Sequence, residues 1–147
     1  MSGTVKAFTH YGLCVSELDR SMRFYTEGLG FEHVITHQIS NEYGKALEVD
    51  GDVKLQSVFL QRDGISMEIL AYESPSTYGT PSANRNQLGL THLSFAVDDV
   101  DSVVEKLVAL GGSVQPETDT KMDGGGRLIF CADPDGTRVE LIEYPPE

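Results

Sequence analysis

The chain has 147 residues, of which 39% are hydrophobic and 23% charged, as in one compact globular domain or two small modules sharing a core. Its formal net charge of −12 disfavours non-specific binding to nucleic acid or to an anionic membrane, because their phosphate groups would be repelled. With two cysteines, no membrane-spanning apolar run and no apolar leader, the sequence favours a reduced, cytoplasmic protein.

The first predicted element is a strand over residues 7–15, where side chains alternate in character. Tyr11, Leu13 and Val15 share an apolar face, and His10 lies on the opposite face among small side chains. A helix follows, capped at Ser16. Its apolar stripe is formed by Leu18, Met22, Tyr25 and Leu29.

Three strands complete the first half, over residues 45–51, 53–61 and 65–72, giving the order β-α-β-β-β. In the last of them Glu68 lies on the face opposite the apolar residues. His33 and His37 fall after the helix, on an expected edge strand. Residues 73–89 are rich in Pro, Ser, Gly and Asn and form a linker long enough to act as a flap.

The second half repeats this order. Residues 91–97 predict a strand with His92 on its polar face. A helix capped by Asp98 and ended by Gly111 comes next. Strands are expected over residues 112–120, 127–133 and 137–144, and Glu140 lies on the non-core face of the last one.

The two halves also match residue by residue, which indicates an internal duplication. "HYGLCVSELDRSMRFYTEGLG", from residue 10, aligns without a gap with "HLSFAVDDVDSVVEKLVALGG", from residue 92. "RDGISMEILAY" aligns with "PDGTRVELIEY", so Glu68 matches Glu140. The first half is longer in its middle, over residues 37–54. A matched His and a matched Glu in a chain with four histidines favour a functional explanation over ordinary core packing.

These features resemble the vicinal oxygen chelate superfamily, which includes glyoxalase I, extradiol dioxygenases, methylmalonyl-CoA epimerase, fosfomycin-resistance transferases and bleomycin-binding proteins. "LDRSMRFYTEGLGFE" is similar to the first helix of that family, and "DPDGTRVELIEY" to its closing strand. The resemblance implies an α+β fold with two tandem βαβββ modules, residues 6–72 and 90–144. They would form a curved eight-stranded mixed sheet around a metal cleft, with helices on the outer face. It also implies a homodimer, with modules paired within one chain or across two.

The resemblance further implies a divalent metal ion held by His10, Glu68, His92 and Glu140. Two imidazoles and two carboxylates without a thiolate suit Ni²⁺, Co²⁺, Zn²⁺, Mn²⁺ or Fe²⁺. Such an ion leaves positions for two adjacent oxygens of a small-molecule substrate. By resemblance to glyoxalase I, Glu140 is the expected catalytic base and Glu68 its catalytic partner.

Three functions stay open. A carboxylate at position 68 favours a metal-dependent lyase, isomerase or epimerase. An Fe²⁺-dependent extradiol-type dioxygenase and a non-catalytic drug- or metabolite-binding protein are the alternatives. Cys14 and Tyr72 stand where glyoxalase I has residues for glutathione, which weakens glutathione as the substrate's carrier. Arg85 and Arg138 are candidates for holding an anionic group, with solvated surface as the equally good alternative.

Overall fold

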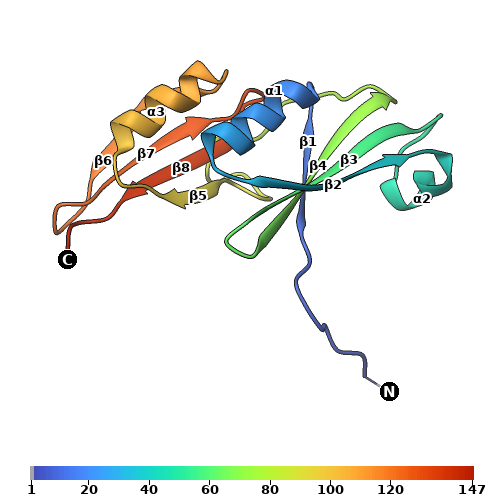
Figure 1. The fold of residues 1–147 in the computed structure, drawn as a ribbon, viewed down its shortest axis with the longest axis horizontal. Helices are drawn as coiled ribbons and strands as arrows, with labels where there is room; N and C mark the ends of the chain where they lie inside the picture. Colours follow the sequence, from blue (N-terminus) through green and yellow to red (C-terminus); the bar gives the residue numbers. More distant parts are fainter. Residues whose placement is uncertain (1) are drawn as a thin grey trace. The chain divides into compact units, whose positions relative to one another are not determined.

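The computed structural model describes residues 2–147, whose contacts divide the chain into two compact units (Figure 1). The first unit comprises residues up to Glu17 and the segment Gly30–Thr77. The second comprises Leu18–Leu29 and Tyr78–Glu147. Each contains a four-stranded mixed sheet, so the predicted α+β fold with eight strands is confirmed. The module boundaries at residues 72 and 90 stay a prediction.

The first sheet has the order β1-β4-β3-β2, with β1 parallel to β4 and the other neighbours antiparallel. Its strands are β1 (Tyr11–Val15), β2 (Glu32–Ile39), β3 (Lys54–Arg62) and β4 (Ile65–Ser74). β1 is shorter than predicted, so His10 directly precedes it. β2 is an edge strand, as expected for the segment that carries His33 and His37.

Alternation along β3 and β4 gives this sheet two different faces. The core face carries the buried residues Val58, Leu60, Met67 and Ile69. On the other face, Glu68 of β4 lies between Gly12 of β1 and Phe59 of β3 in the strand register. The glycine leaves room beside the carboxylate, which is why this face can present a polar group.

The connection between β2 and β3 is helical, and the strand predicted over residues 45–51 is wrong. It forms a short 3₁₀ turn, η2 (Asn41–Tyr43), and one helical turn, α2 (Gly44–Leu47). Tyr43, Ala46 and Leu47 follow the i, i+3, i+4 spacing of a helix, and a short apolar run does not by itself separate helix from strand.

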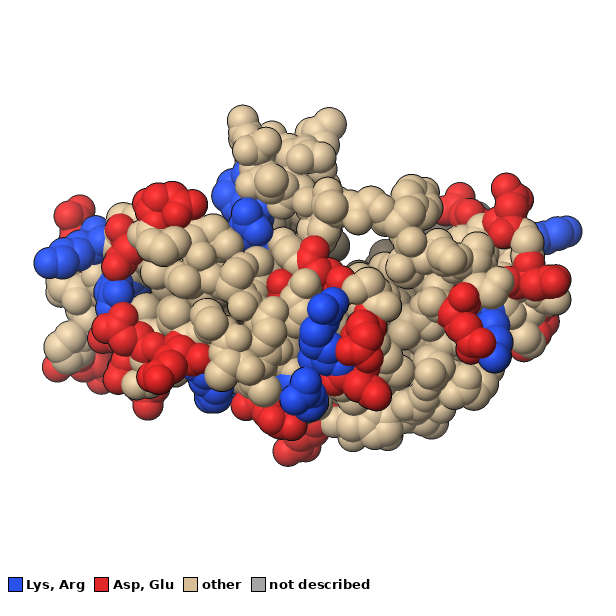
Figure 2. Space-filling view, turned by 90° about the horizontal axis from the view of Figure 1, so that it is seen from above, with Lys and Arg blue, Asp and Glu red and all other residues tan. Residues whose placement is uncertain are grey.

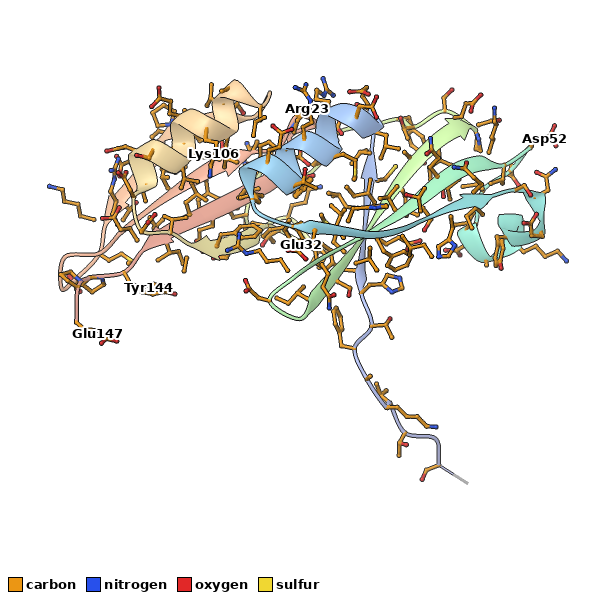
Figure 3. The ribbon with its side chains drawn as sticks, viewed as in Figure 1. Arg23, Glu32, Asp52, Lys106, Tyr144 and Glu147 are labelled. Atoms are coloured by element: carbon orange, nitrogen blue, oxygen red, sulfur yellow. The ribbon has the colours of Figure 1, made fainter. Side chains whose placement is uncertain are left out.

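Asn41 holds the two ends of this connection together. Its side-chain carbonyl accepts a hydrogen bond from the backbone N–H of Val53 (2.6 Å). Its amide donates to Asp52 (3.4 Å), in the loop before β3 (Figure 3). The helical segment is therefore tied back to the strand that it precedes.

The second sheet has the order β5-β8-β7-β6, with β5 parallel to β8. Its elements are β5 (Leu93–Ala96), α3 (Val100–Ala109), β6 (Ser113–Lys121), β7 (Arg127–Ala132) and β8 (Arg138–Glu143). The same unit includes α1 (Leu18–Arg23) and the π-helical turn η1 (Phe24–Gly28) that extends it.

The N-cap of α3 is Asp99, and the predicted cap at Asp98 is wrong. The Asp99 carboxylate accepts hydrogen bonds from the backbone N–H (3.0 Å) and the hydroxyl (2.8 Å) of Ser102. The sequence does not show which of the adjacent residues Asp98 and Asp99 is the N-cap. Only the hydrogen bond from the backbone N–H three residues later, at Ser102, identifies Asp99. Gly111, with φ of +92°, follows the helix end as expected.

Close packing joins η1 to α3 and to the β7–β8 turn. A Cβ added at Gly28 would lie 2.8 Å from the Leu107 side chain, and one added at Gly112 would lie 2.6 Å from the Phe24 ring. The buried Tyr25 hydroxyl donates to the buried Asp133 carboxylate (2.8 Å). These contacts connect the two segments on which the family resemblance rests.

Acidic side chains lie at many places on the face drawn in Figure 2, with Lys and Arg in smaller groups, consistent with the negative net charge. Among residues 2–147, no helix is long and apolar enough to cross a membrane.

Candidate metal half-sites

In the first unit, His10 and Glu68 are brought together by the parallel pairing of β1 with β4. Glu68 pairs with Gly12, two residues beyond His10, so the histidine reaches the same face. The His10 Nε2 atom lies 3.1 Å from Glu68 Oε2. The other ring nitrogen, Nδ1, lies 3.1 Å from the hydroxyl of Thr9.

Two further residues fix this pair. The Ser57 hydroxyl donates to Glu68 Oε1 (2.6 Å), so both carboxylate oxygens have a partner. The Phe59 ring meets the His10 ring edge to face, with centroids 5.0 Å apart. Side-chain freedom of the histidine and the glutamate is therefore limited before any ligand binds.

The second unit contains the equivalent pair. His92 Nε2 lies 3.9 Å from Glu140 Oε1, and His92 Nδ1 lies 2.7 Å from the Thr91 hydroxyl. The Phe130 ring meets the His92 ring edge to face at 5.2 Å, as Phe59 does in the first unit. Phe130 is the register partner of Glu140.

The serines differ between the units. Ser94, on β5, donates to Glu140 Oε1 (2.8 Å), whereas Ser57 lies on β3. Both contacts of Glu140 therefore fall on the same oxygen, and within residues 2–147 its Oε2 atom has no hydrogen-bond partner. Glu140 keeps one carboxylate oxygen available, and Glu68 does not.

The four predicted ligands thus form two His–Glu pairs, one in each unit. Their side chains are 34% (His10), 21% (Glu68), 31% (His92) and 16% (Glu140) exposed, so none is sealed in hydrocarbon packing. No group of three or more His, Cys, Asp or Glu side chains that could hold a metal is found in residues 2–147. That all four share one ion stays a prediction.

The chemistry of each pair fits a divalent metal. A threonine at Nδ1 fixes the ring and directs Nε2 towards the carboxylate, the outer-shell arrangement that metal-binding histidines use. Imidazole nitrogen and carboxylate oxygen are ligands for borderline and hard divalent ions.

Cys14 is exposed. Side chains alternate along β1, so Cys14 lies on the same face as Gly12 and His10. Burial raises the pKa of the nearby Tyr72 phenol, and electrostatic interaction with Cys14 and Glu68 raises it further. Tyr72 is therefore a neutral hydrogen-bonding group at neutral pH.

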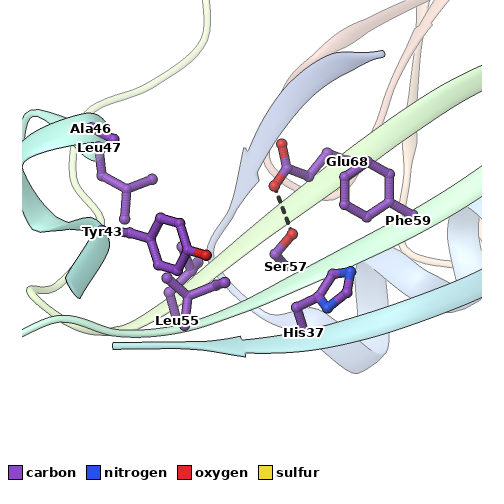
Figure 4. Close-up of a pocket in the computed structure, with 9 residues that line it drawn as sticks. His37, Tyr43, Ala46, Leu47, Leu55, Ser57, Phe59 and Glu68 are labelled. Carbon is purple, nitrogen blue, oxygen red and sulfur yellow. Dashed lines mark hydrogen bonds between the residues drawn. The ribbon is translucent and has the colours of Figure 1, made fainter. Parts of the chain in front are cut away.

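A cavity of about 290 Å³ adjoins Glu68 in the first unit (Figure 4). It is lined by His37, Ile39, Tyr43, Ala46, Leu47, Leu55, Ser57, Phe59 and Glu68. Sequence reasoning missed the part of this lining that comes from Ala46 and Leu47, because it treated residues 45–51 as a strand. The i, i+3, i+4 spacing of the apolar residues in the β2–β3 connection was the available signal.

In the second unit, Arg85 is fixed by the linker that carries it. Its guanidinium donates to the backbone carbonyls of Thr91 and Ser82 and lies 5.9 Å from the centre of the Phe130 ring. Burial, and then the positive charge of Arg138, lower the pKa of Arg85. These contacts give Arg85 a role in ordering the linker, and its predicted role in holding an anion stays a prediction.

A duplicated βαβββ fold with a His–Glu pair in each half is the arrangement expected of vicinal oxygen chelate proteins. The chain belongs to the glyoxalase/bleomycin resistance protein/dioxygenase superfamily, whose family model matches residues 7–141.

Two curated relatives are named lactoylglutathione lyases. The Haemophilus influenzae protein is 30% identical over 138 residues, covering 91% of this chain and 90% of the relative. The Arabidopsis thaliana protein is 30% identical over 141 residues, covering 96% of this chain, and the chain spans only 45% of that relative's length. These names suggest an enzyme and leave the reaction of this chain open.

Solved structures agree on the fold. A glyoxalase family protein from Bacillus cereus has a TM-score of 0.83 at 20% identity, covering 98% of this chain and 97% of the other. The fosfomycin resistance protein FosX from Listeria monocytogenes was solved with Mn(II) and sulfate. It has a TM-score of 0.62 at 20% identity, covering 96% of this chain and 94% of the other.

Proposed function

We propose that the protein is a metal-dependent, glyoxalase-like lyase or isomerase, or an epimerase, of a small substrate with two adjacent oxygens. The observation that carries this proposal is the duplicated half-site. In both units a threonine contacts His Nδ1, a glutamate faces His Nε2, and a phenylalanine contacts the histidine ring.

His10, Glu68, His92 and Glu140 would hold the metal, with one pair from each unit. When bound, the metal supplies Lewis-acid stabilisation of negative charge next to a substrate carbonyl. The ion in the FosX structure supports the view that this fold accommodates a divalent metal. The choice among Ni²⁺, Co²⁺, Zn²⁺, Mn²⁺ and Fe²⁺ is left to metal analysis.

Glu140 is the proposed base. Its Oε2 atom has no partner within residues 2–147, while Ser94 holds Oε1 and fixes the carboxylate plane. Oε2 can take a proton from the carbon beside the substrate carbonyl. In an isomerisation the proton returns to the neighbouring carbon while the substrate's hydroxyl proton moves to the former carbonyl oxygen, and in an epimerisation a proton returns to the opposite face of the same carbon, so atoms balance without an added reagent. Glu68, engaged at both oxygens, is better suited to binding than to moving a proton.

The test is metal analysis of purified wild-type protein and of His10→Ala and His92→Ala. His33→Ala is the matched control, because His33 is exposed and its ring nitrogen hydrogen-bonds with the hydroxyl of Thr36. We expect each ligand variant to lower metal affinity by at least about tenfold, since even outer-shell changes cost about 10–100-fold. Metal content unchanged by His92→Ala would refute the four-ligand proposal.

Activity is then assayed with a hemithioacetal of methylglyoxal and with an acyl-CoA epimer, using each metal in turn. We expect turnover in wild type and a large loss in Glu140→Gln, because the amide cannot accept the proton. If no metal-loaded form converts either substrate, the lyase and epimerase assignment is wrong. The expected homodimer is part of this proposal and is checked by light scattering.

One observation favours the dioxygenase alternative. His37, expected only as a nominal acid–base candidate on an edge strand, lines the same cavity as Glu68. Oxygen uptake with catechol by the Fe²⁺-loaded protein, lost in His37→Ala, would favour ring cleavage over isomerisation.

A further inference from the structure

We infer that the β2–β3 connection forms a specificity pocket for an uncharged, largely apolar substituent of the substrate. The inference rests on the proposed function, because it places this pocket beside the substrate's metal-binding oxygens at Glu68. The cavity itself is a property of the first unit and does not depend on a bound metal.

The pocket is built by four neighbouring elements. β2 contributes His37 and Ile39, β3 contributes Leu55, Ser57 and Phe59, and β4 contributes Glu68. The remaining lining comes from Tyr43 of η2 and from Ala46 and Leu47 of α2 (Figure 4). Tyr43, Ala46 and Leu47 lie within residues 37–54, where the first half of the chain is longer than the second.

The chemistry of the lining selects against charge. Six of the nine lining residues are apolar or aromatic, and none is Lys or Arg. The only carboxylate is Glu68, and Ser57 already donates its hydroxyl to that carboxylate. An anionic substituent in the pocket would therefore lose its hydration and be repelled by the Glu68 carboxylate, and the lining has no Lys or Arg to pair with it.

The size of the cavity limits the substituent. A volume of about 290 Å³ lies just below the range of about 300–1,000 Å³ for small-molecule sites. His37, Tyr43 and Ala46 are exposed, so the pocket is open on that side. These dimensions suit one six-membered ring or a short branched alkyl group, with His37 and the Tyr43 hydroxyl available to one polar atom.

The second unit shows why this pocket belongs to the longer half. There the β6–β7 connection is the glycine-rich turn at residues 122–126, and in the described residues it contains no helix. The substituent pocket is thus an addition to one copy of the duplicated module. This asymmetry commits the inference to a substrate with one apolar end.

The first experiment uses metal-free protein and follows backbone amide shifts by NMR during titration with benzamide and with benzoate. We expect benzamide to shift the amides of Tyr43 to Leu47 and to bind about tenfold more tightly than benzoate. Equal or tighter benzoate binding, shifts elsewhere, or no binding of benzamide would each overturn the inference.

Substitutions at one exposed lining position sharpen this test. Ala46→Phe should abolish benzamide binding by filling the pocket. Ala46→Lys should reverse the preference towards benzoate by adding a cation. Ile65→Phe and Ile65→Lys are the matched controls, because Ile65 is 52% exposed in the same unit and does not line the cavity. Controls that behave like the Ala46 variants would refute the assignment.

The second experiment separates this inference from the proposed function. Metal-loaded protein is titrated with acetohydroxamate and benzohydroxamate, which present the same pair of adjacent oxygens. We expect the benzohydroxamate advantage to be about tenfold in wild type and to vanish in Ala46→Phe. If neither hydroxamate binds while the benzamide result holds, the metal proposal fails and the pocket stands. If both bind equally, the pocket inference fails and the metal proposal stands.

Discussion

Tyr25→Phe tests the connection between the first helical segment and the β7–β8 turn. The Tyr25 hydroxyl donates to Asp133 Oδ2 (2.8 Å), and both residues are buried. Asp133 Oδ1 accepts from the backbone N–H groups of Asp135 and Thr137 (both 2.9 Å). Removing the hydroxyl leaves Oδ2 buried without this donor, while the shape of the ring is kept.

The expected loss is about 2 kcal/mol of unfolding free energy, because a hydrogen bond to a charged group contributes about 1.5–3 kcal/mol. For a chain of 147 residues, about 1 kcal/mol lowers Tm by about 2–4 °C. Tyr25→Phe should therefore lower Tm by about 4–8 °C. Tyr78→Phe, at a position 99% exposed, should change stability by less than about 0.5 kcal/mol.

The pH dependence gives a second readout. Burial raises the pKa of Asp133, whereas the bond from Tyr25 acts to lower it. A raised carboxyl pKa means that folding takes up a proton, so this group costs stability as pH rises through the folded-state pKa. Loss of the Tyr25 bond raises that pKa further. The effect of Tyr25→Phe should therefore be largest where Asp133 is ionised and shrink as the carboxyl becomes protonated.

Thermal unfolding followed by circular dichroism at neutral pH and at pH 4 measures both effects. A loss below about 0.5 kcal/mol at neutral pH would show that the bond contributes little. A loss that is the same at both pH values would refute the assigned charge state. Asp133→Asn closes a double-mutant cycle, because the amide oxygen can still accept from the backbone N–H groups while the carboxylate oxygen that accepts from Tyr25 is lost.

Further predictions concern packing and thiol reactivity. Leu107→Ala should destabilise the protein by about 2–5 kcal/mol in urea unfolding, because Leu107 is fully buried. Gly112→Ala should cost about 1–3 kcal/mol in the same assay, because its Cβ would lie 2.6 Å from the Phe24 ring and 2.7 Å from a backbone oxygen; wild-type stability would contradict the observed packing. Burial raises the pKa of Cys131 to about 11, so iodoacetamide at pH 8 should label exposed Cys14 and spare Cys131 until the chain unfolds, as mass spectrometry would show.

Much of the fold could be predicted, because alternation and helical spacing repeat in both halves. The strands that end at Val15 and those around Glu68 and Glu140 occur where the pattern indicates. The β2–β3 connection could not be predicted in the same way, because a short apolar run there is compatible with strand or helix and has no counterpart in the second half.

The residues of the candidate site could be predicted from the sequence, but their arrangement in space could be predicted only in part. His10 and Glu68 are far apart in the sequence, and only the parallel pairing of β1 with β4 brings them to 3.1 Å. The contribution of Ser57 depends on the β3–β4 register, which the sequence pattern does not specify. His37 shows the same limit, since its place in the cavity follows from the helical connection beyond it.

The contacts of Phe24 and Tyr25 with Gly112 and Asp133 have a consequence for how this gene can recombine. A chimera joined at the repeat boundary would take the aromatic pair from one parent and its glycine and aspartate from another. Such hybrids should fold only when both parents use compatible residues at all of these positions.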